Sequence, residues 1–106
     1  MLQKYKKYFK ESVLTVPTEI DTENATDEQI LRTSIVSELS AINLYQTLAD
    51  QTSNKFLKKL LLDIAKEEKT HVGEFNKMLS SYVDSEQAKE DINGSKEVDD
   101  LKNKVK

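Results

Sequence analysis

The stretch that most constrains this chain is residues 64–71, IAKEEKTH, which contains a Glu-x-x-His motif formed by Glu68 and His71. In a helix, two side chains three residues apart lie on the same face, one turn from each other. An ionised carboxylate on a buried face is costly unless it has a partner, and a metal ion is one such partner. The rest of this face is apolar, at steps of three and four residues, and consists of Leu57, Leu60, Leu61, Ile64, Phe75, Met78, Leu79 and Tyr82.

A second predicted helix, earlier in the chain, also carries an acid on its apolar face. Glu38 lies midway between Ile35 and Ile42, on one side of that helix. Each of two helices therefore places an acid where a core residue belongs, and the second helix adds the only histidine of the chain. The pattern predicts Glu38, Glu68 and His71 as metal ligands and catalytic residues. The apolar stripe of this earlier helix, on which Glu38 lies, comprises Leu31, Ile35, Ile42, Tyr45 and Leu48.

Composition narrows the class of protein. With 106 residues, of which 33% are charged and 37% hydrophobic, the chain suits one small domain that completes its core with another subunit. A net charge of -3 gives no reason to expect nucleic-acid binding. Cysteine is absent, which excludes disulfides and thiolate metal sites and is compatible with a reducing cytoplasm. No signal peptide is evident, and no apolar run approaches the roughly 20 residues that span a bilayer.

The sequence predicts an all-α fold in three parts. Residues 1–25 are irregular or extended, with a basic, aromatic run over 1–11 that either docks on an acidic surface, such as the chain's own tail, or packs as a terminal turn. Residues 26–82 form two long antiparallel helices, about 27–51 and 54–82, because a capping box begins at Thr26 and only a short break separates the helices. Residues 83–106 form an acidic tail of short helices, the first ending at Asn93-Gly94.

A single hairpin leaves part of the apolar stripe of each helix exposed to water. It also supplies only three ligands, which are too few to hold two metal ions. A two-fold dimer meets both needs, because it makes a four-helix bundle with four carboxylates and two imidazoles. Such oxygen and nitrogen ligands suit two iron ions, with Mn or Zn as substitutes.

Simpler interpretations of these residues stay open. Glu68 and His71 also fit a buried hydrogen-bonded pair without metal, and Tyr45 fits either a donor beside the site or a plain core residue. Glu67 and Glu74 are solvent-facing, or they are outer acids at the mouth of the site.

Two segments, residues 38–45 (ELSAINLY) and 62–75 (LDIAKEEKTHVGEF), resemble the encapsulated ferritin family, and above all the ferritin-like domain fused to archaeal encapsulins. The similarity covers residues 27–101 and does not include the first 25 residues. It implies that Glu38, Glu68 and His71 hold iron and that Tyr45 stands beside the site. Leu44 replaces a Trp found in many members, and no encapsulin-targeting peptide is evident.

The resemblance also implies that Fe(II) and dioxygen are the substrates. It implies a homodimer that assembles into a larger ring, with a decamer expected, and a location in the cytoplasm, inside an encapsulin shell. The predicted function is a ferroxidase, an iron(II):oxygen oxidoreductase that feeds iron storage in the nanocompartment. Two alternatives are rubrerythrin-like peroxide reduction at the same site and a non-catalytic helical interaction module, with no nucleic acid or membrane partner in any case.

Overall fold

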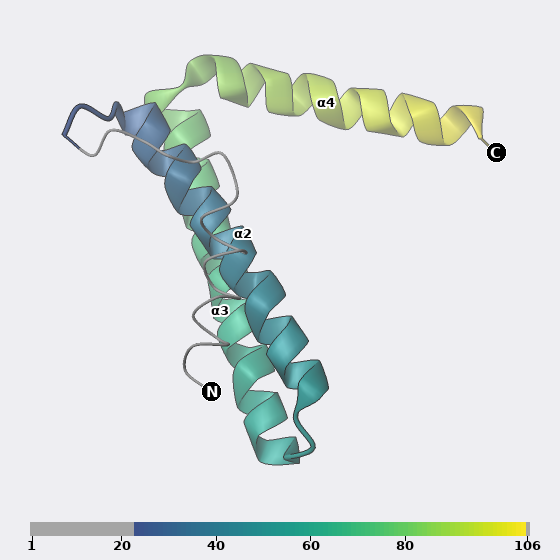
Figure 1. Cartoon of the computed structure of the whole chain (residues 1–106). Helices are drawn as coiled ribbons and strands as arrows, with labels where there is room; N and C mark the ends of the chain where they lie inside the picture. Colours follow the sequence, from purple (N-terminus) through teal and green to yellow (C-terminus); the bar gives the residue numbers. More distant parts are fainter. Residues whose placement is uncertain (1–22, 106) are drawn as a thin grey trace.

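The computed structural model describes residues 23–105, and every regular element in that range is helical. The elements are α2 (Asp27–Gln51), α3 (Lys55–Met78), the π-helical turn η1 (Leu79–Val83) and α4 (Ser85–Lys104). Helices α2 and α3 form an antiparallel hairpin, η1 continues α3, and α4 turns away from it (Figure 1). The two long helices match those predicted, whereas the extended segment expected over residues 1–25 lies outside the described residues except for its last three.

Side-chain caps fix where the two long helices begin. The Thr26 hydroxyl accepts from the Gln29 backbone N–H at 3.2 Å, and the Gln29 side chain accepts from the Thr26 N–H at 3.0 Å, which is the predicted capping box. At the start of α3, the Asn54 side-chain oxygen accepts from the N–H groups of Phe56 and Leu57, both at 3.0 Å. Both starts are therefore set by residues within one turn.

The hairpin buries only a thin seam. None of the described residues is a large side chain with less than 2% exposure, and several large apolar residues of α3 stay about half exposed. The radius of gyration is 17.1 Å, against about 13 Å for a compact chain of 100 residues. The described chain is therefore extended, and much of its apolar surface is exposed to solvent. Its buried apolar residues are Leu31, Ile42, Ala49, Ala65 and Leu79.

Asp84 joins the hairpin to α4. Its N–H donates to the Leu79 carbonyl at 2.7 Å, which closes the π-helical turn. One carboxylate oxygen accepts from the Gln87 N–H at 3.3 Å and so caps α4, while the other lies 2.9 Å from the Arg32 guanidinium on α2. One side chain therefore begins α4 and ties it to the open end of the hairpin.

The predicted break at Asn93-Gly94 is wrong. Helix α4 is a single helix of 20 residues that runs through these two positions, and not several short helices. Gly94 has no positive φ, and Asn93 donates to Glu90 at 3.3 Å, one turn back, instead of turning the chain. A second pair of side chains, Gln87 and Asp91, bonds at 2.8 Å. A helical glycine costs about 1 kcal/mol, which a cap and such pairs offset.

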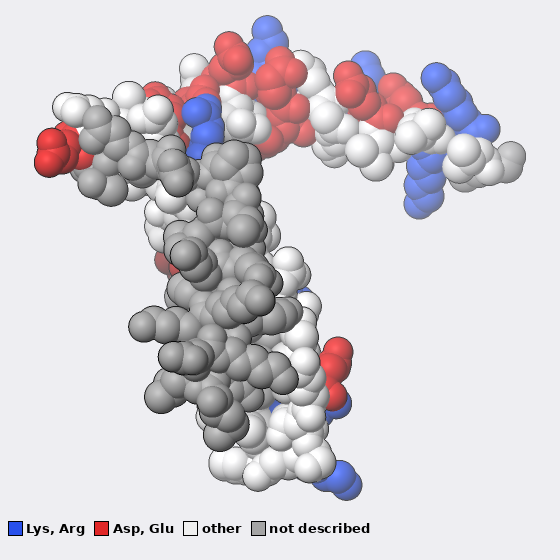
Figure 2. Space-filling model, viewed as in Figure 1, with Lys and Arg blue, Asp and Glu red and all other residues white. Residues whose placement is uncertain are grey.

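Helix α4 contacts η1 but neither α2 nor α3. Figure 2 shows acidic side chains along most of the length of α4 and lysines mainly toward its end. None of the described helices is long and apolar enough to cross a membrane.

We predict that Asp84→Asn and Asp84→Ala have different effects on α4. Asparagine keeps the capping oxygen and removes the ion pair with Arg32, which costs about 0–1 kcal/mol because Arg32 is largely exposed. Alanine removes the cap as well, at a further cost of about 1 kcal/mol. Hydrogen exchange of the α4 amides measures both effects, and equal exchange in the two variants would contradict the capping role.

Candidate metal centre

The structure brings the three predicted ligands together in the central part of the hairpin. Glu38 comes from α2, and Glu68 and His71 come from consecutive turns of α3. One ligand atom from each lies within 4.8 Å of the other two. Two ligands on opposite sides of one ion, each about 2.1 Å from it, are about 4.2 Å apart, so small side-chain rotations would let all three groups share an ion.

Two carboxylates compete for one imidazole nitrogen. His71 Nδ1 lies 3.4 Å from Glu68 Oε2 and 3.5 Å from Glu38 Oε2. A single N–H cannot satisfy both at these distances, and only the contact with Glu68 has hydrogen-bond geometry. Glu38 Oε2 is fully buried and has no hydrogen-bond partner among the described residues. A buried carboxylate oxygen without a partner is costly, and it is the atom a cation would satisfy.

A small residue on α3 lets the acids approach. Ala65, three residues before Glu68, is 2% exposed and lies on the same side of α3 as Glu68. Side chains at the contact set how closely two helices pack, so a small residue here lets the two backbones come together. His71 stays 45% exposed, while the two acids are 20% and 19% exposed. The open side of the cluster is therefore the imidazole side, away from the seam.

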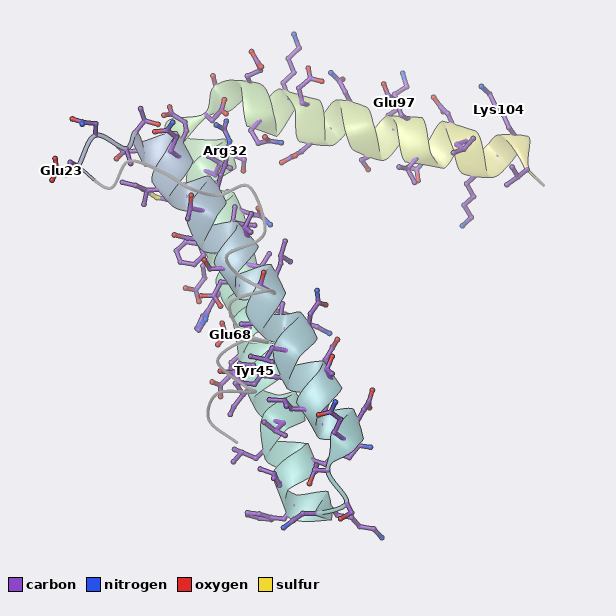
Figure 3. The ribbon with its side chains drawn as sticks, in the orientation of Figure 1. Glu23, Arg32, Tyr45, Glu68, Glu97 and Lys104 are labelled. Atoms are coloured by element: carbon purple, nitrogen blue, oxygen red, sulfur yellow. The ribbon has the colours of Figure 1, made fainter. Side chains whose placement is uncertain are left out.

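The lesser candidates are not members of this cluster. Figure 3 shows Tyr45 and Glu68 in the same central region of the hairpin. Tyr45 is half-buried, and within the range the structure covers it makes no hydrogen bond to the three ligands. Glu67 and Glu74 are exposed on α3, as expected for acids that face solvent. Among the described residues, the only metal-type group of three comprises Glu38, Glu68 and His71.

A second hollow at the hairpin tip is a weaker candidate. It measures about 350 Å³ and contains no ionisable group in its lining. Without an acid, base or nucleophile it offers binding surface but no chemistry. Its lining consists of Leu48, Gln51, Thr52, Leu57 and Leu61.

Hard oxygen donors with one imidazole favour iron, manganese or zinc, and no sulfur donor is present in this chain. The buried, partnerless oxygen of Glu38 fits that set. Sequence reasoning missed no member of the cluster. It did not find the unpaired oxygen, which depends on how the Glu38 side chain packs against α3.

Three comparisons with known proteins agree on the family. The profile of the rubrerythrin family matches residues 29–103. A ferritin-like–encapsulin shell fusion protein of Pyrococcus furiosus is 47% identical over 73 residues, which is 69% of this chain and 21% of that protein. This chain therefore spans about a fifth of the curated relative that it matches. The crystal structure of the encapsulated ferritin domain from Pyrococcus furiosus superposes with a TM-score of 0.69 at 42% identity, covering 80% of this chain and 90% of that one.

The matched region contains the hairpin that holds Glu38, Glu68 and His71, except for the first two residues of α2. A relative above 40% identity that is covered almost completely shares both fold and family with this chain. The chain therefore belongs to the rubrerythrin family of iron-related, ferritin-like proteins, and within it to the encapsulated ferritins.

Proposed function

We propose that this chain is a ferroxidase that binds two Fe(II) ions between two copies of itself and oxidises them with dioxygen. The observation that carries the proposal is the buried Glu38 oxygen, which accepts no hydrogen bond from the described residues and belongs to a cluster with Glu68 and His71 whose ligand atoms lie within 4.8 Å of one another. In this function Fe(II) is the substrate. Membership of an iron-related family supports iron over other metals.

Half a di-iron site per chain argues for a dimer. In ferritin-like bundles, two helices each give a Glu and two each give a Glu-x-x-His pair. This chain supplies one of each kind, so two copies complete the set. The resemblance to the encapsulated ferritins implies that Glu68 would be the ligand shared by the two ions.

The apolar stripe of α3 is symmetric about Glu68, which suits a two-fold axis there. Leu61 and Phe75 lie seven residues to either side, and Ile64 and Val72 lie four to either side. All four are only half-buried. A two-fold axis across α3 at Glu68 sets Leu61 against the partner subunit's Phe75 and the reverse, so one contact covers both halves of the stripe.

The chemistry is an electron transfer from two metal ions to one oxygen molecule. Each Fe(II) gives one electron and becomes Fe(III), and dioxygen takes these two electrons with two protons to give hydrogen peroxide. Carboxylates assist because they shift between one and two metal contacts as the charge rises. The residues with these roles are Glu38, Glu68 and His71, with Tyr45 beside them and Glu67 and Glu74 outside.

We further propose that the oxidised iron passes to storage in an encapsulin compartment, with dimers arranged in a ring. Support comes from the relative whose name joins a ferritin-like part to an encapsulin shell. The described chain is an open hairpin with one projecting helix, which encloses no storage volume of its own.

Peroxide reduction at the same site is the second candidate, and the rubrerythrin family match favours it. In that reaction Fe(II) gives electrons to hydrogen peroxide instead of dioxygen. The chain lacks cysteine, so it contains no thiolate iron centre to resupply electrons. A third function, a metal-free interaction module in which the acids and His71 only set dimer register, predicts that metal has no effect on assembly.

We predict that Glu68→Ala lowers the rate of Fe(II) oxidation in air to that of buffer alone, because the bridging ligand is lost. The measurement is near-ultraviolet absorbance after mixing anaerobic Fe(II) protein with oxygenated buffer. Glu67→Ala is the matched control, since it removes a neighbouring acid that is exposed, and we expect it to keep most of the native rate. Equal, slow traces for all three proteins would contradict the ferroxidase. Fast reaction with peroxide alone would select the second candidate.

We predict that Glu38→Leu stabilises the metal-free protein while abolishing Fe(II) binding. The change removes a buried acceptor that has no hydrogen-bond partner among the described residues, worth about 1–3 kcal/mol in the free energy of unfolding. Urea denaturation with a chelator measures the stability, and anaerobic titration measures the binding. The control Glu67→Leu, at an exposed position, should change stability by less than about 0.5 kcal/mol. A less stable Glu38→Leu protein would show that this carboxylate has a partner without metal.

We predict that Fe(II) shifts the native protein toward assemblies with an even number of subunits, because each ion takes ligands from two copies. Native mass spectrometry without oxygen, with and without Fe(II), measures the shift, and Glu68→Ala should remove it. A compact monomer that holds iron would overturn the interface site, and masses independent of iron would favour the interaction module.

A further inference from the structure

Helix α4 has no partner among the described helices other than η1. Its apolar side chains lie open, with Ile92 72% exposed and Val98 66% exposed. A 20-residue helix with asparagine, glycine and serine at positions 93–95 is marginal in water by its own propensity. A stable α4 therefore calls for a segment that covers it.

The middle of α4, from Asp91 to Asp99, offers a surface of defined character. A shallow depression of about 400 Å³ has Ile92 as its apolar part and two acids, Asp91 and Asp99, on its sides. Ser95 and Lys96 complete its lining. From Asp84 to Asp100 the chain carries seven acids and two lysines, a net charge of -5. The occupant that this surface favours is basic with apolar or aromatic side chains.

Residues 1–10 of the same chain have that composition. They contain four lysines, no acid and three aromatic residues, giving a net side-chain charge of +4. They also lie before the part of the chain that matches the family, residues 29–103, so the shared fold does not account for them. The basic and aromatic side chains are Lys4, Tyr5, Lys6, Lys7, Tyr8, Phe9 and Lys10.

The chain is long enough for this contact. The described part begins at the end of the hairpin where α4 also begins, as Figure 1 shows and as the 2.9 Å contact between Arg32 and Asp84 requires. Residues 11–22 span up to about 40 Å when extended. Ile92 lies eight residues beyond Asp84, or about 12 Å along the helix axis. Asp99, at the far side of the depression, lies 15 residues beyond Asp84, or about 22 Å along the axis. The whole depression is therefore within reach of the chain.

We propose that residues 1–10 dock on the α4 of their own chain, over the depression formed by Asp91, Ile92, Ser95, Lys96 and Asp99. Lysines pair with Asp91 and Asp99, while an aromatic ring covers Ile92. A second α4 is a poorer occupant of this face, because two helices of the same strongly negative charge repel each other. The contact holds α4 in its helical form.

The test is hydrogen exchange of the α4 amides in the full-length chain. We expect Lys4→Glu with Lys7→Glu to speed exchange over α4 about tenfold, since the segment no longer holds the helix closed. Adding Asp91→Lys and Asp99→Lys to that chain exchanges the charges and should restore slow exchange. The matched control adds Glu90→Lys and Glu97→Lys instead. It changes the net charge equally on the opposite face of α4 and should restore nothing.

Two further results decide the proposal. Equal restoration by both acid pairs would overturn the docking site, since only net charge would then count, and unchanged exchange in the first variant would overturn it as well. Carbodiimide coupling of a mixture of isotopically heavy and light chains tests the assignment to one chain. Cross-links from residues 4–10 to Asp91 or Asp99 within one isotope support it, and mixed-isotope cross-links would assign the contact to a second copy.

Discussion

The packing of α2 against α3 buries a seam one side chain wide, from Leu31 and Ile42 to Ala65 and Leu79. Two helices touch along one line, so a hairpin always leaves the remaining width of each apolar stripe uncovered. Glu38 and Glu68 lie beside that seam and reduce the stability of the hairpin further, because a carboxylate on a partly buried face costs free energy unless it has a partner. The hairpin therefore depends on something that covers the stripe and satisfies the acids together.

A metal-bridged dimer would answer both demands with one event. Two copies bring four carboxylates to the interface, a charge of -4 that opposes association without metal. Two Fe(II) ions add +4, so binding iron and joining the subunits become thermodynamically linked. Oxidation to Fe(III) raises the metal charge to +6, and the excess positive charge then favours hydroxide binding or release of iron from the site. In this scheme the cost of the unpaired Glu38 oxygen is a cost of the metal-free state alone.

Sequence predicted the parts of this structure that local spacing determines. Thr26 was identifiable as a helix start because a cap acts within one turn. Glu38, Glu68 and His71 were identifiable because spacings of three and four residues place them on apolar stripes. Asn93-Gly94 misled because turn-forming residues carry weak preferences that a strong cap and neighbouring side-chain pairs override. The contact between Arg32 and Asp84 spans 52 positions and left no local signal.

That contact also determines how much of the molecule α4 can reach. Asp84 divides its two oxygens between the α4 cap and Arg32, so the direction of α4 is fixed at the end of the hairpin farthest from the tip. The candidate metal ligands lie in the middle of the hairpin, and α4 makes no contact with either helix that carries them. Changes along α4 should therefore leave iron oxidation by a dimer intact, whereas changes at Glu68 should leave the α4 amides as protected as before. The candidate metal site and α4 can therefore be changed independently, because they belong to one chain but are not in contact with each other.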